Sequence, residues 1–184
     1  SELLTGVLYC MEWGRRRGVR MAATLEDVAV TGIDGLVGTL LNSGLFIRYD
    51  QGSETVYAVE PTKHPVASYY RNTIIHHFLD RAIIELSLLK ARELHRQPAA
   101  EVFWTETGRL RDLFKFEFFY PDKEEFRANL ETELGRVDDD WQAKLAQGAD
   151  RLHSLLSRFQ PLIGHVIYLA LTEAYTVVLW IMNG

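Results

Sequence analysis

His76 and Asp80 are the pair of side chains in this sequence that could most directly carry out chemistry. They lie four residues apart, so a continuous helix would place them on one face. There the carboxylate could orient the imidazole as a general base, or the two groups could form a hydrogen-bonded structural pair. Zinc binding is a third use of such residues, but the adjacent rings of His76 and His77 would point about 100° apart on a helix. No third group of ligands is obvious, so we expect no metal site.

Other signatures of catalysis and phosphate binding are missing. The sequence has no G-x-S-x-G nucleophile elbow and no Walker-type glycine-rich loop. Cys10 is the only cysteine, so no disulfide can form within the chain, which fits a reducing compartment. The three aspartates at 138–140 lack the spread ligands and the glycine of a calcium loop. They suit the solvated start of a helix before Trp141 better.

Composition and charge narrow the possible functions. The chain has 184 residues, of which 47% are hydrophobic and 24% charged, an ordinary globular composition with room for one domain or two small ones. Its formal net charge of -5 argues against a general nucleic-acid binder, which would be basic. One short basic cluster could bind phosphate or anionic lipid, or could lie in a solvated loop. The cluster comprises Arg15, Arg16, Arg17 and Arg20.

The strongest helical pattern lies between Ser68 and Leu89. Apolar residues recur there at three- and four-residue steps over a wide face, as in a helix buried on several sides. Asn72 would cap its start, and Pro98 would stop it. The apolar face consists of Ile75, Phe78, Leu79, Ala82, Leu86 and Leu89. We therefore expect a central helix at residues 72–96.

The first 67 residues have the element order of a small winged-helix-like unit. Residues 1–13 and Thr24–Asn42 predict short helices, and Gly44 suits the left-handed end of the second region. Two β-rich runs, Leu45–Tyr49 and Thr55–Glu60, flank a turn sequence and predict a hairpin. A linker punctuated by prolines then leads to the rest of the chain.

Further helices and one strand are predicted after the central helix. The alternation of aromatic and charged residues in Phe114–Tyr120 has period two and predicts a strand. Asp122–Leu134 and Trp141–Phe159 predict helices. Residues 162–182 are mostly apolar and long enough to cross a membrane, but Glu173 near the middle would be costly in lipid. A span, a buried helix and a surface helix all remain open for this segment.

The expected fold is mainly α, formally α+β: a helical domain with a winged-helix-like β-hairpin near the N-terminus and one further strand. We expect a small unit at residues 1–67 and a helical region at 68–184 around the central helix. Apolar sequence reaches close to both ends of the chain. We therefore expect this chain to be a segment of a longer protein.

The segment Ser68–His76, S-Y-Y-R-N-T-I-I-H, resembles the Y-Y-R-N-x-[IL]-[IL]-H segment of the PlsB family of bacterial glycerol-3-phosphate acyltransferases, most closely the actinobacterial branch. The likeness continues at Arg111–Tyr120 and Asp122–Leu134, and faintly at Glu173–Tyr175. It covers the family's region downstream of the acyltransferase domain. The resemblance implies a parent enzyme that transfers an acyl chain from acyl-CoA or acyl carrier protein to the sn-1 hydroxyl of glycerol 3-phosphate, in phospholipid synthesis. It implies no other cofactor and a peripheral location at the cytoplasmic face of the membrane.

The catalytic motif of that family is absent from this chain. Its histidine takes the hydroxyl proton, and an aspartate five positions later orients the imidazole. The residues five positions after the six histidines are Tyr69, Arg81, Ala82, Ala100, Arg158 and Ala170. The Glu-Gly-x-Arg phosphate-binding motif is absent too. We expect the catalytic centre to lie outside this chain, which would be a scaffold or docking region, inactive alone.

Candidate binding residues remain in the segment that carries the resemblance. They are Tyr69, Tyr70, Arg71, Asn72 and His76. At a helix N-terminus, Arg71 would contact a phosphate or the catalytic domain; alternatively, the tyrosines are core and Arg71 forms a structural ion pair. The expected partners are the catalytic domain of the same parent protein and a membrane surface.

A different class of function is the alternative. The predicted helix, helix and hairpin would also suit a winged-helix-like interaction or DNA-binding module without enzymatic activity. However, the helix at Ile33–Asn42 is rich in Gly, Leu and Val rather than in polar side chains that read bases. We therefore do not expect nucleic acid as a partner.

Overall fold

The computed structural model describes residues 2–26, 28, 32–115, 117–159, 164 and 168 of the chain. Over these residues it is mainly helical, with a two-stranded antiparallel hairpin. The expected α+β class is therefore confirmed. Two compact units divide the chain, Ser1–His77 and Phe78–Gly184, so the division falls later than the boundary expected after residue 67.

The C-terminal apolar segment lies largely outside this description. Of residues 162–182, only Gly164 and Tyr168 are described, and Glu173–Tyr175 falls outside the described residues. Among the helices that are described, none has the length and apolar character needed to cross a membrane.

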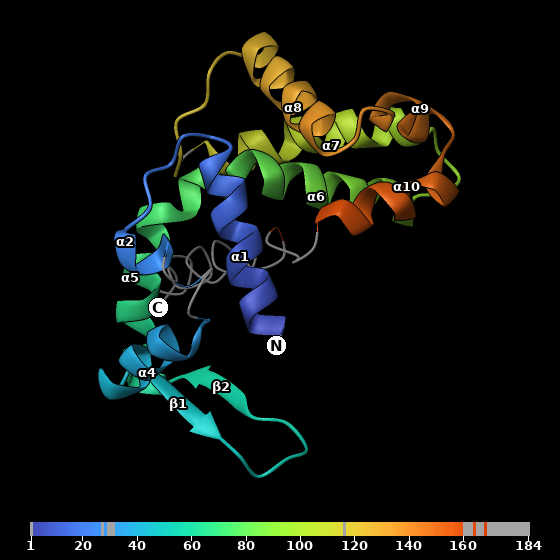
Figure 1. The fold of residues 1–184 in the computed structure, drawn as a ribbon. Coiled ribbons are helices and arrows are strands. Elements are labelled where there is room, and N and C mark those ends of the chain that lie inside the picture. The colour runs from blue at the N-terminus through green and yellow to red at the C-terminus, as the bar shows by residue number, and fades with distance from the viewer. Residues whose placement is uncertain are drawn as a thin grey trace, which may run out of the picture. The chain divides into compact units, whose positions relative to one another are not determined.

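The first unit combines short helices with the hairpin (Figure 1). Its elements are α1 (Glu2–Arg15), α2 (Ala23–Glu26), α4 (Asp34–Asn42), β1 (Phe46–Tyr49), β2 (Val56–Val59), the 3-10 turn η1 (Pro61–Lys63) and α5 (His64–Ile74). The strands pair antiparallel with Phe46 opposite Val59, which confirms the predicted hairpin. Gly44 has a φ of 70°, the left-handed conformation expected after α4.

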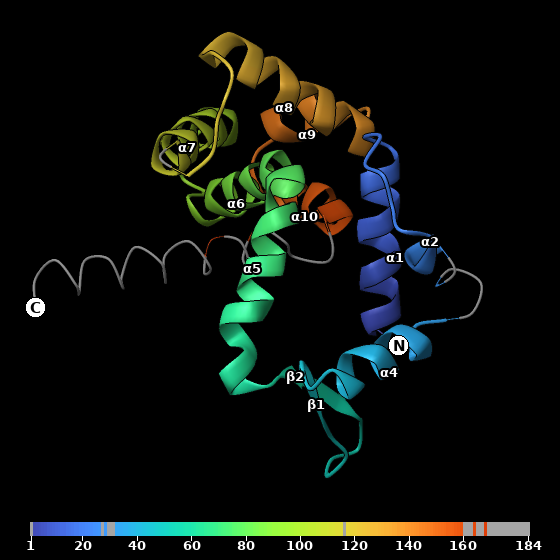
Figure 2. The same cartoon turned by 90° about the vertical axis from the view of Figure 1, so that its left-hand side faces the viewer.

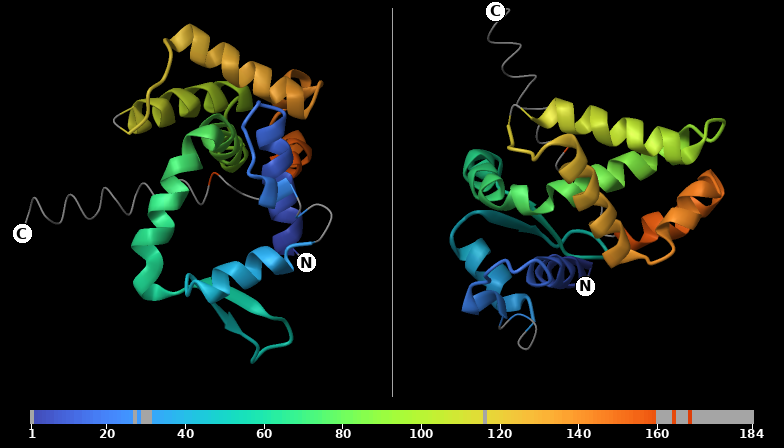
Figure 3. Two further views of the ribbon diagram at one scale, coloured as in Figure 1. Left: turned by 60° about the vertical axis from the view of Figure 1, so that its left-hand side comes forward. Right: turned by 90° about the horizontal axis from the view of Figure 1, so that it is seen from above.

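A small apolar cluster holds the first unit together. Its buried members are Val28, Ile33 and Val37. Side chains of α1, of α4 and of β2 pack against these three residues. Figure 3 shows α4 beside the hairpin, in agreement with the contacts between α4 and β1. The predicted order of helices and strands is thus present in this unit.

The central helix predicted at residues 72–96 is interrupted near its start, and α6 begins only at Leu79. α5 already starts at His64, where Pro65 occupies the first turn and its missing N–H costs no hydrogen bond. A 3-10 turn, η2 (Ile75–Phe78), separates α5 from α6 (Leu79–Glu93). Asn72 therefore lies inside α5 and does not cap a helix, and the expected linker at residues 60–68 is partly helical.

The second unit is built around α6. Its other elements are α7 (Ala99–Phe114), α8 (Lys123–Val137), α9 (Trp141–Ala146), α10 (Ala149–Leu156) and the 3-10 turn η3 (Ser157–Phe159). α6 packs against α7, α8 and α10, and Figure 2 shows it between α7 and α10. Ala82, Ile83 and Leu88 of α6 are fully buried. The burial of this helix on several sides is as the sequence predicted.

No strand forms among the described residues of Phe114–Tyr120. Phe114 is the last residue of α7 and is fully buried. The backbone N–H groups of Glu117 and Phe118 both donate to the Phe114 carbonyl at 3.0 Å, which continues the helix end as a turn. The prediction of a further strand there was wrong, because Leu110 and Phe114 extend a helical face that outweighs the short alternation.

Two later elements differ in detail from the prediction. Asp122 caps α8 and accepts hydrogen bonds from the N–H groups of Glu124 and Glu125 at 3.0 and 2.9 Å, as expected. The single helix predicted for Trp141–Phe159 is instead three pieces. Gly148 separates α9 from α10 with a φ of 94°, a conformation that interrupts a right-handed helix.

Candidate functional site

The predicted binding residues lie together on α5 and the turn after it. Tyr69, Tyr70, Arg71 and Asn72 belong to the C-terminal half of α5, and His76 belongs to η2. Tyr69 and Tyr70 are 68% and 62% exposed, and their rings meet edge to face with centroids 5.7 Å apart. The interpretation of these tyrosines as core residues was therefore wrong.

The exposed tyrosines are part of a larger apolar surface on α5. Val66 and Ile74 are also exposed, at 45% and 54%. Val66, Tyr70 and Ile74 follow one another at four-residue steps, so they share one side of the helix. Neighbouring exposed apolar side chains of this size typically mark an interaction surface. We call Val66, Tyr69, Tyr70 and Ile74 the α5 face.

Arg71 stands beside this face at the carbonyl end of α5. It lies in the last turn, and its carbonyl accepts the N–H of Ile75. Its Nε is 3.3 Å from the side-chain oxygen of Asn72, and no carboxylate of a described residue forms an ion pair with it. The helix N-terminus expected to assist anion binding is therefore not there. The guanidinium instead complements the negative end of the helix dipole and keeps most of its donors for a partner.

The rings of His76 and His77 lie in contact, tilted against each other, in the 3-10 turn. Their ring centroids are 3.9 Å apart with the planes inclined by 43°, although an α-helix would point them well apart. Burial, and then the neighbouring His76, hold the pKa of His77 below its ordinary value. Asp80 lies in the first turn of α6, so no continuous α-helix joins it to His76, as the predicted pairing required.

The basic cluster around Arg16 and the acidic residues around Asp138 both form contacts within the chain. Arg16 pairs with Glu12 at 2.8 Å, and the Arg17 guanidinium lies 3.3 Å from the centroid of the Trp13 ring. Asp138 is buried and forms an ion pair with Lys144. No group of three or more potential ligands for a metal occurs among the described residues.

A buried polar connection on α6 was missed from the sequence. Arg81 and Glu85 are both fully buried. Arg81 donates to the carbonyl of Phe159, and a Glu85 carboxylate oxygen accepts the N–H of Gly164 at 3.0 Å. These groups attach residues far along the chain to α6. The only signal in the sequence was a cation and a carboxylate four residues apart within an apolar run.

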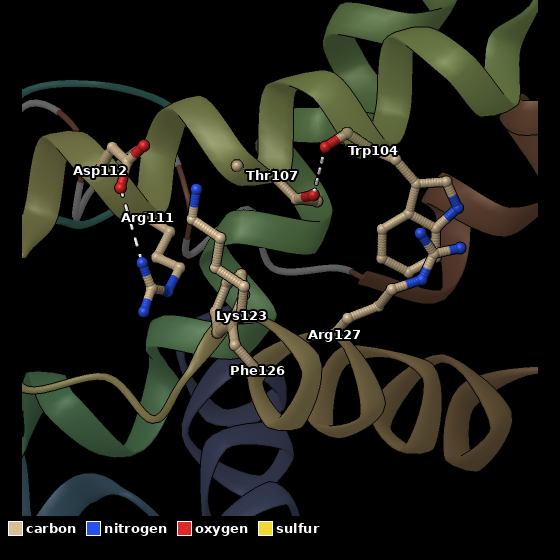
Figure 4. Close-up of a pocket in the computed structure, with 8 residues that line it drawn as sticks. Trp104, Thr107, Arg111, Asp112, Lys123, Phe126 and Arg127 are labelled. Atoms are coloured by element: carbon tan, nitrogen blue, oxygen red, sulfur yellow. Dashed lines mark hydrogen bonds and ion pairs between the residues drawn. The ribbon is translucent and has the colours of Figure 1, made fainter.

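A small cationic pocket between α7 and α8 was also missed. Figure 4 shows its side chains, and its volume is about 150 Å³. It is lined by Trp104, Thr107, Gly108, Arg111, Asp112, Lys123, Phe126 and Arg127. Because α7 was not predicted as a helix, the sequence could not show that these residues share one surface.

The comparisons with known proteins agree with the resemblance of the α5 segment. Residues 1–183 match the family described as glycerol-3-phosphate acyltransferase C-terminal region. The chain belongs to this family. Proteins of Mycobacterium bovis and Mycobacterium tuberculosis, provisionally named acyltransferase plsB1, are 35% identical to it over 183 residues.

Membership of the acyltransferase C-terminal region family concerns only part of a protein. The match covers 97% of this chain but 29% of each of these mycobacterial relatives. No solved structure significantly matches the chain. The activity of the whole protein is therefore not a property that this region alone can establish.

Proposed function

We propose that this region is the non-catalytic part of a glycerol-3-phosphate 1-O-acyltransferase and that it docks on the catalytic domain of the same protein. The parent would transfer an acyl chain from acyl-CoA or acyl carrier protein to the sn-1 hydroxyl of glycerol 3-phosphate. Membership of the C-terminal region family supports the acyltransferase assignment. The docking role is supported by features of the chain itself.

A non-catalytic role agrees with the chemistry that the sequence offers. None of its histidines is followed five positions later by an aspartate. In such an enzyme the imidazole must remove the hydroxyl proton while the oxygen attacks the thioester carbon, and the carboxylate fixes the tautomer. His76, the candidate base, contacts the tilted ring of His77 in a 3-10 turn. These residues support a position outside the catalytic centre.

The α5 face is the observation that carries the docking proposal. Isolated exposed apolar residues are common, but four large ones on successive turns of one short helix form a patch. The tyrosines offer apolar rings and a polar hydroxyl, a combination enriched in interfaces. Arg71 adds a cation at the edge of the patch that no described carboxylate neutralises. This chemistry suits a protein surface with an apolar centre and an acidic rim.

The location proposed for the parent follows from its substrates. One substrate carries a long acyl chain and the other a phosphate, so the product is amphipathic. A peripheral position at the cytoplasmic membrane face would bring these together.

Footprinting of the tyrosines tests the docking proposal directly. Hydroxyl-radical labelling of the full-length parent should leave Tyr69 and Tyr70 protected, although this region exposes them at 68% and 62%. Tyr49 of β1, 50% exposed and outside the α5 face, is the internal reference and should be labelled. Labelling of all three tyrosines at similar rates would show that nothing covers the face.

A matched pair of arginine variants tests whether docking affects acyl transfer. Arg71→Ala in the parent should lower kcat/KM about three- to tenfold, as expected for a lost interface contact worth about 1 kcal/mol. Arg92→Ala removes an exposed cation of α6 that has no ion pair among the described residues, and it should leave the rate unchanged. Unchanged kinetics of Arg71→Ala at unchanged thermal stability would rule out its docking role.

A further inference from the structure

We propose that the pocket between α7 and α8 binds a phosphate monoester. This site lies in the second unit, and its chemistry is independent of the proposed docking of α5. The inference rests on the charges lining the pocket, the way its guanidinium groups are held and its size. None of these requires the parent to be an acyltransferase.

Positive charge predominates in the pocket. Arg111 comes from α7, and Lys123 and Arg127 come from successive turns of α8. The lining contains a single carboxylate, Asp112, which is 3.5 Å from the Arg111 guanidinium. Arg127 also pairs with Glu131 at 3.0 Å, outside the lining, so the three cations exceed the two neighbouring carboxylates and leave positive charge that a bound anion would complement.

The guanidinium of Arg127 is held ready for a ligand. It lies 4.1 Å from the centroid of the Trp104 ring, a cation–π contact that uses the face of the guanidinium. Its Nε donates to Glu131 at 3.0 Å. The terminal nitrogens have no hydrogen-bond partner among the described residues, so their in-plane donors remain for an acceptor. Such preorganisation reduces the entropy lost on binding.

Arg111 is fixed on the other side of the pocket. One terminal nitrogen donates to the Pro121 carbonyl at 2.6 Å. The guanidinium carbon lies 5.6 Å from the centroid of the Phe126 ring, and the Nε is buried without a partner among the described residues. The side chain is therefore oriented by packing and by a backbone bond, and the intramolecular contacts leave part of its hydrogen-bonding capacity unused.

Lys123 supplies the most available charge. It forms no ion pair among the residues that the structure describes, and Figure 4 shows it reaching from α8 toward α7 with Arg111 and Arg127 on either side. The helix N-terminus itself is not the site, because Asp122 already occupies the N–H groups of Glu124 and Glu125. Side chains, rather than the helix end, would hold the anion.

The size and charge of the pocket select the ligand class. About 150 Å³ corresponds to roughly five water volumes, which fits one phosphate group and the first atoms attached to it rather than a nucleotide. A phosphate monoester carries a charge of about −1.5 to −2 and three acceptor oxygens, which can engage three separate cations. A carboxylate has one charge and two oxygens and would leave a cation unmatched.

A second hollow in the same unit lacks these properties. It lies between α6 and α7, has a volume of about 350 Å³ and includes Lys90 and Arg109 in its lining. Each of these cations pairs with a carboxylate in the same lining, Lys90 with Glu93 at 2.8 Å and Arg109 with Glu106 at 2.6 Å. No excess charge remains there, so the phosphate site is assigned to the α7–α8 pocket.

The test follows the Lys123 amine in the full-length protein by lysine labelling and mass spectrometry. Addition of sn-glycerol 3-phosphate, inorganic phosphate or phosphatidate vesicles should protect Lys123 saturably, at least fivefold more than acetate at equal ionic strength. Arg127→Gln should raise the half-protection concentration about tenfold, as expected for a lost charge-assisted hydrogen bond. This readout is local, so it does not depend on other phosphate sites or on activity.

Two glycine variants provide the steric control. A side chain at Gly108 would project into open space beside the pocket, since no atom lies within 4 Å of an added Cβ. Gly108→Leu should therefore abolish the protection without disturbing the fold. Gly135→Leu makes the same change on α8, also with no atom within 4 Å of the added Cβ, and should retain it. Equal protection in Gly108→Leu would overturn the assignment.

The probes also distinguish the source of the phosphate. Protection by free sn-glycerol 3-phosphate identifies a soluble monoester, whereas protection by phosphatidate vesicles alone identifies a lipid headgroup. In the second case Phe119→Ser should weaken the effect, because Phe119 is completely exposed on the segment joining α7 to α8. The proposal is refuted if none of the three probes protects Lys123 at 10 mM phosphate. That concentration is roughly 100 times a Kd of 0.1 mM, so a site of that affinity would be saturated.

Discussion

Replacing Gly164 with alanine tests how closely the chain approaches α6. An added Cβ would lie 2.8 Å from the carbonyl oxygen of Ala82, 3.1 Å from Leu86 and 3.2 Å from Glu85. The nearest of these atoms belongs to the backbone of a fully buried helix residue, so it cannot move aside easily. We expect overpacking of this kind to cost about 1–3 kcal/mol of unfolding free energy.

The matched control is Gly108→Ala in the middle of α7. No atom lies within 4 Å of the added Cβ there, and alanine in a helix interior is favoured over glycine by about 0.5–1 kcal/mol. Both variants lose similar freedom in the unfolded chain. The two variants should therefore differ by about 1.5–4 kcal/mol, most of it from the clash in the folded state.

Urea and thermal unfolding of the two variants give the answer. For a chain of this length the difference corresponds to roughly 3–16 °C in Tm, with Gly164→Ala lower than wild type and Gly108→Ala equal or higher. The hydrogen bond from the Gly164 N–H to Glu85 would be strained in the first variant only. If the two variants unfold at the same temperature, the close approach of Gly164 to α6 is refuted.

Three further predictions concern single polar groups. Asp138→Asn should lower the unfolding free energy by about 1–3 kcal/mol near neutral pH, because it breaks the buried pair with Lys144. The hydrogen bond from Lys144 holds the pKa of Asp138 below its ordinary 3.8. The stabilisation is therefore complete above that pH and is lost as the pH falls through the folded-state pKa. Urea titrations from pH 6 to pH 3 should show the stability deficit of the variant shrinking only below about pH 4, and an unchanged deficit would contradict the pairing. Tyr120→Phe should be neutral or stabilising by up to about 1 kcal/mol, because the buried hydroxyl has no hydrogen-bond partner among the described residues; a clear loss of stability in thermal unfolding would reveal a partner. His76→Ala should raise the pKa of His77 part of the way toward 6.5, since burial, the larger cause of its lowering, remains. An NMR titration that shows no change would argue against the close contact of the two rings.

The boundaries of α5 and α6 show where sequence patterns are weakest. The apolar face from Ile75 onward was predicted in part: Leu79 and Ala82 are buried, whereas Leu86 and Leu89 are only partly buried. The start of the helix was not predicted, because Asn72 favours an N-cap, whereas this exposed turn of α5 tolerates asparagine in the helix interior at only a small cost in propensity. Whether the chain turned at residue 72 or at residue 75 depended on packing that the local sequence does not contain.

α7 shows a different failure. Its buried residues recur at helical steps, but Glu and Thr side chains between them made the region look polar, and no helix was predicted. The aromatic residues that follow then suggested a strand. The buried members of α7 are Ala99, Val102, Phe103, Thr107, Leu110 and Phe114. Counting this 3.6-residue period across the whole stretch would have predicted the helix and excluded Phe114 from a strand.

The candidate site could be predicted in part. A family resemblance pointed to Tyr69, Tyr70 and Arg71 as residues of interest. The exposure of the two tyrosines could not be predicted, since tyrosine is found both in cores and on surfaces. The α7–α8 pocket was beyond prediction, because its three cations become neighbours only when two helices pack together. Lys123 and Arg127 are four residues apart and so indicate a shared helix face, but nothing in the sequence places Arg111 beside them.

The pocket also shows why the net charge of the chain does not by itself exclude binding of a phosphate. A formal charge of -5 makes non-specific binding to polyanions unfavourable, yet at physiological salt the field of an exposed charge is largely screened beyond about 8 Å. A phosphate in the pocket would therefore respond to Arg111, Lys123 and Arg127 more than to the acidic surface elsewhere. Binding that weakens only modestly with added salt would agree with a built site, because the Arg111 side chain is largely covered, with 15% of it exposed. A steep salt dependence with no loss in Gly108→Leu would instead indicate diffuse attraction to surface charge.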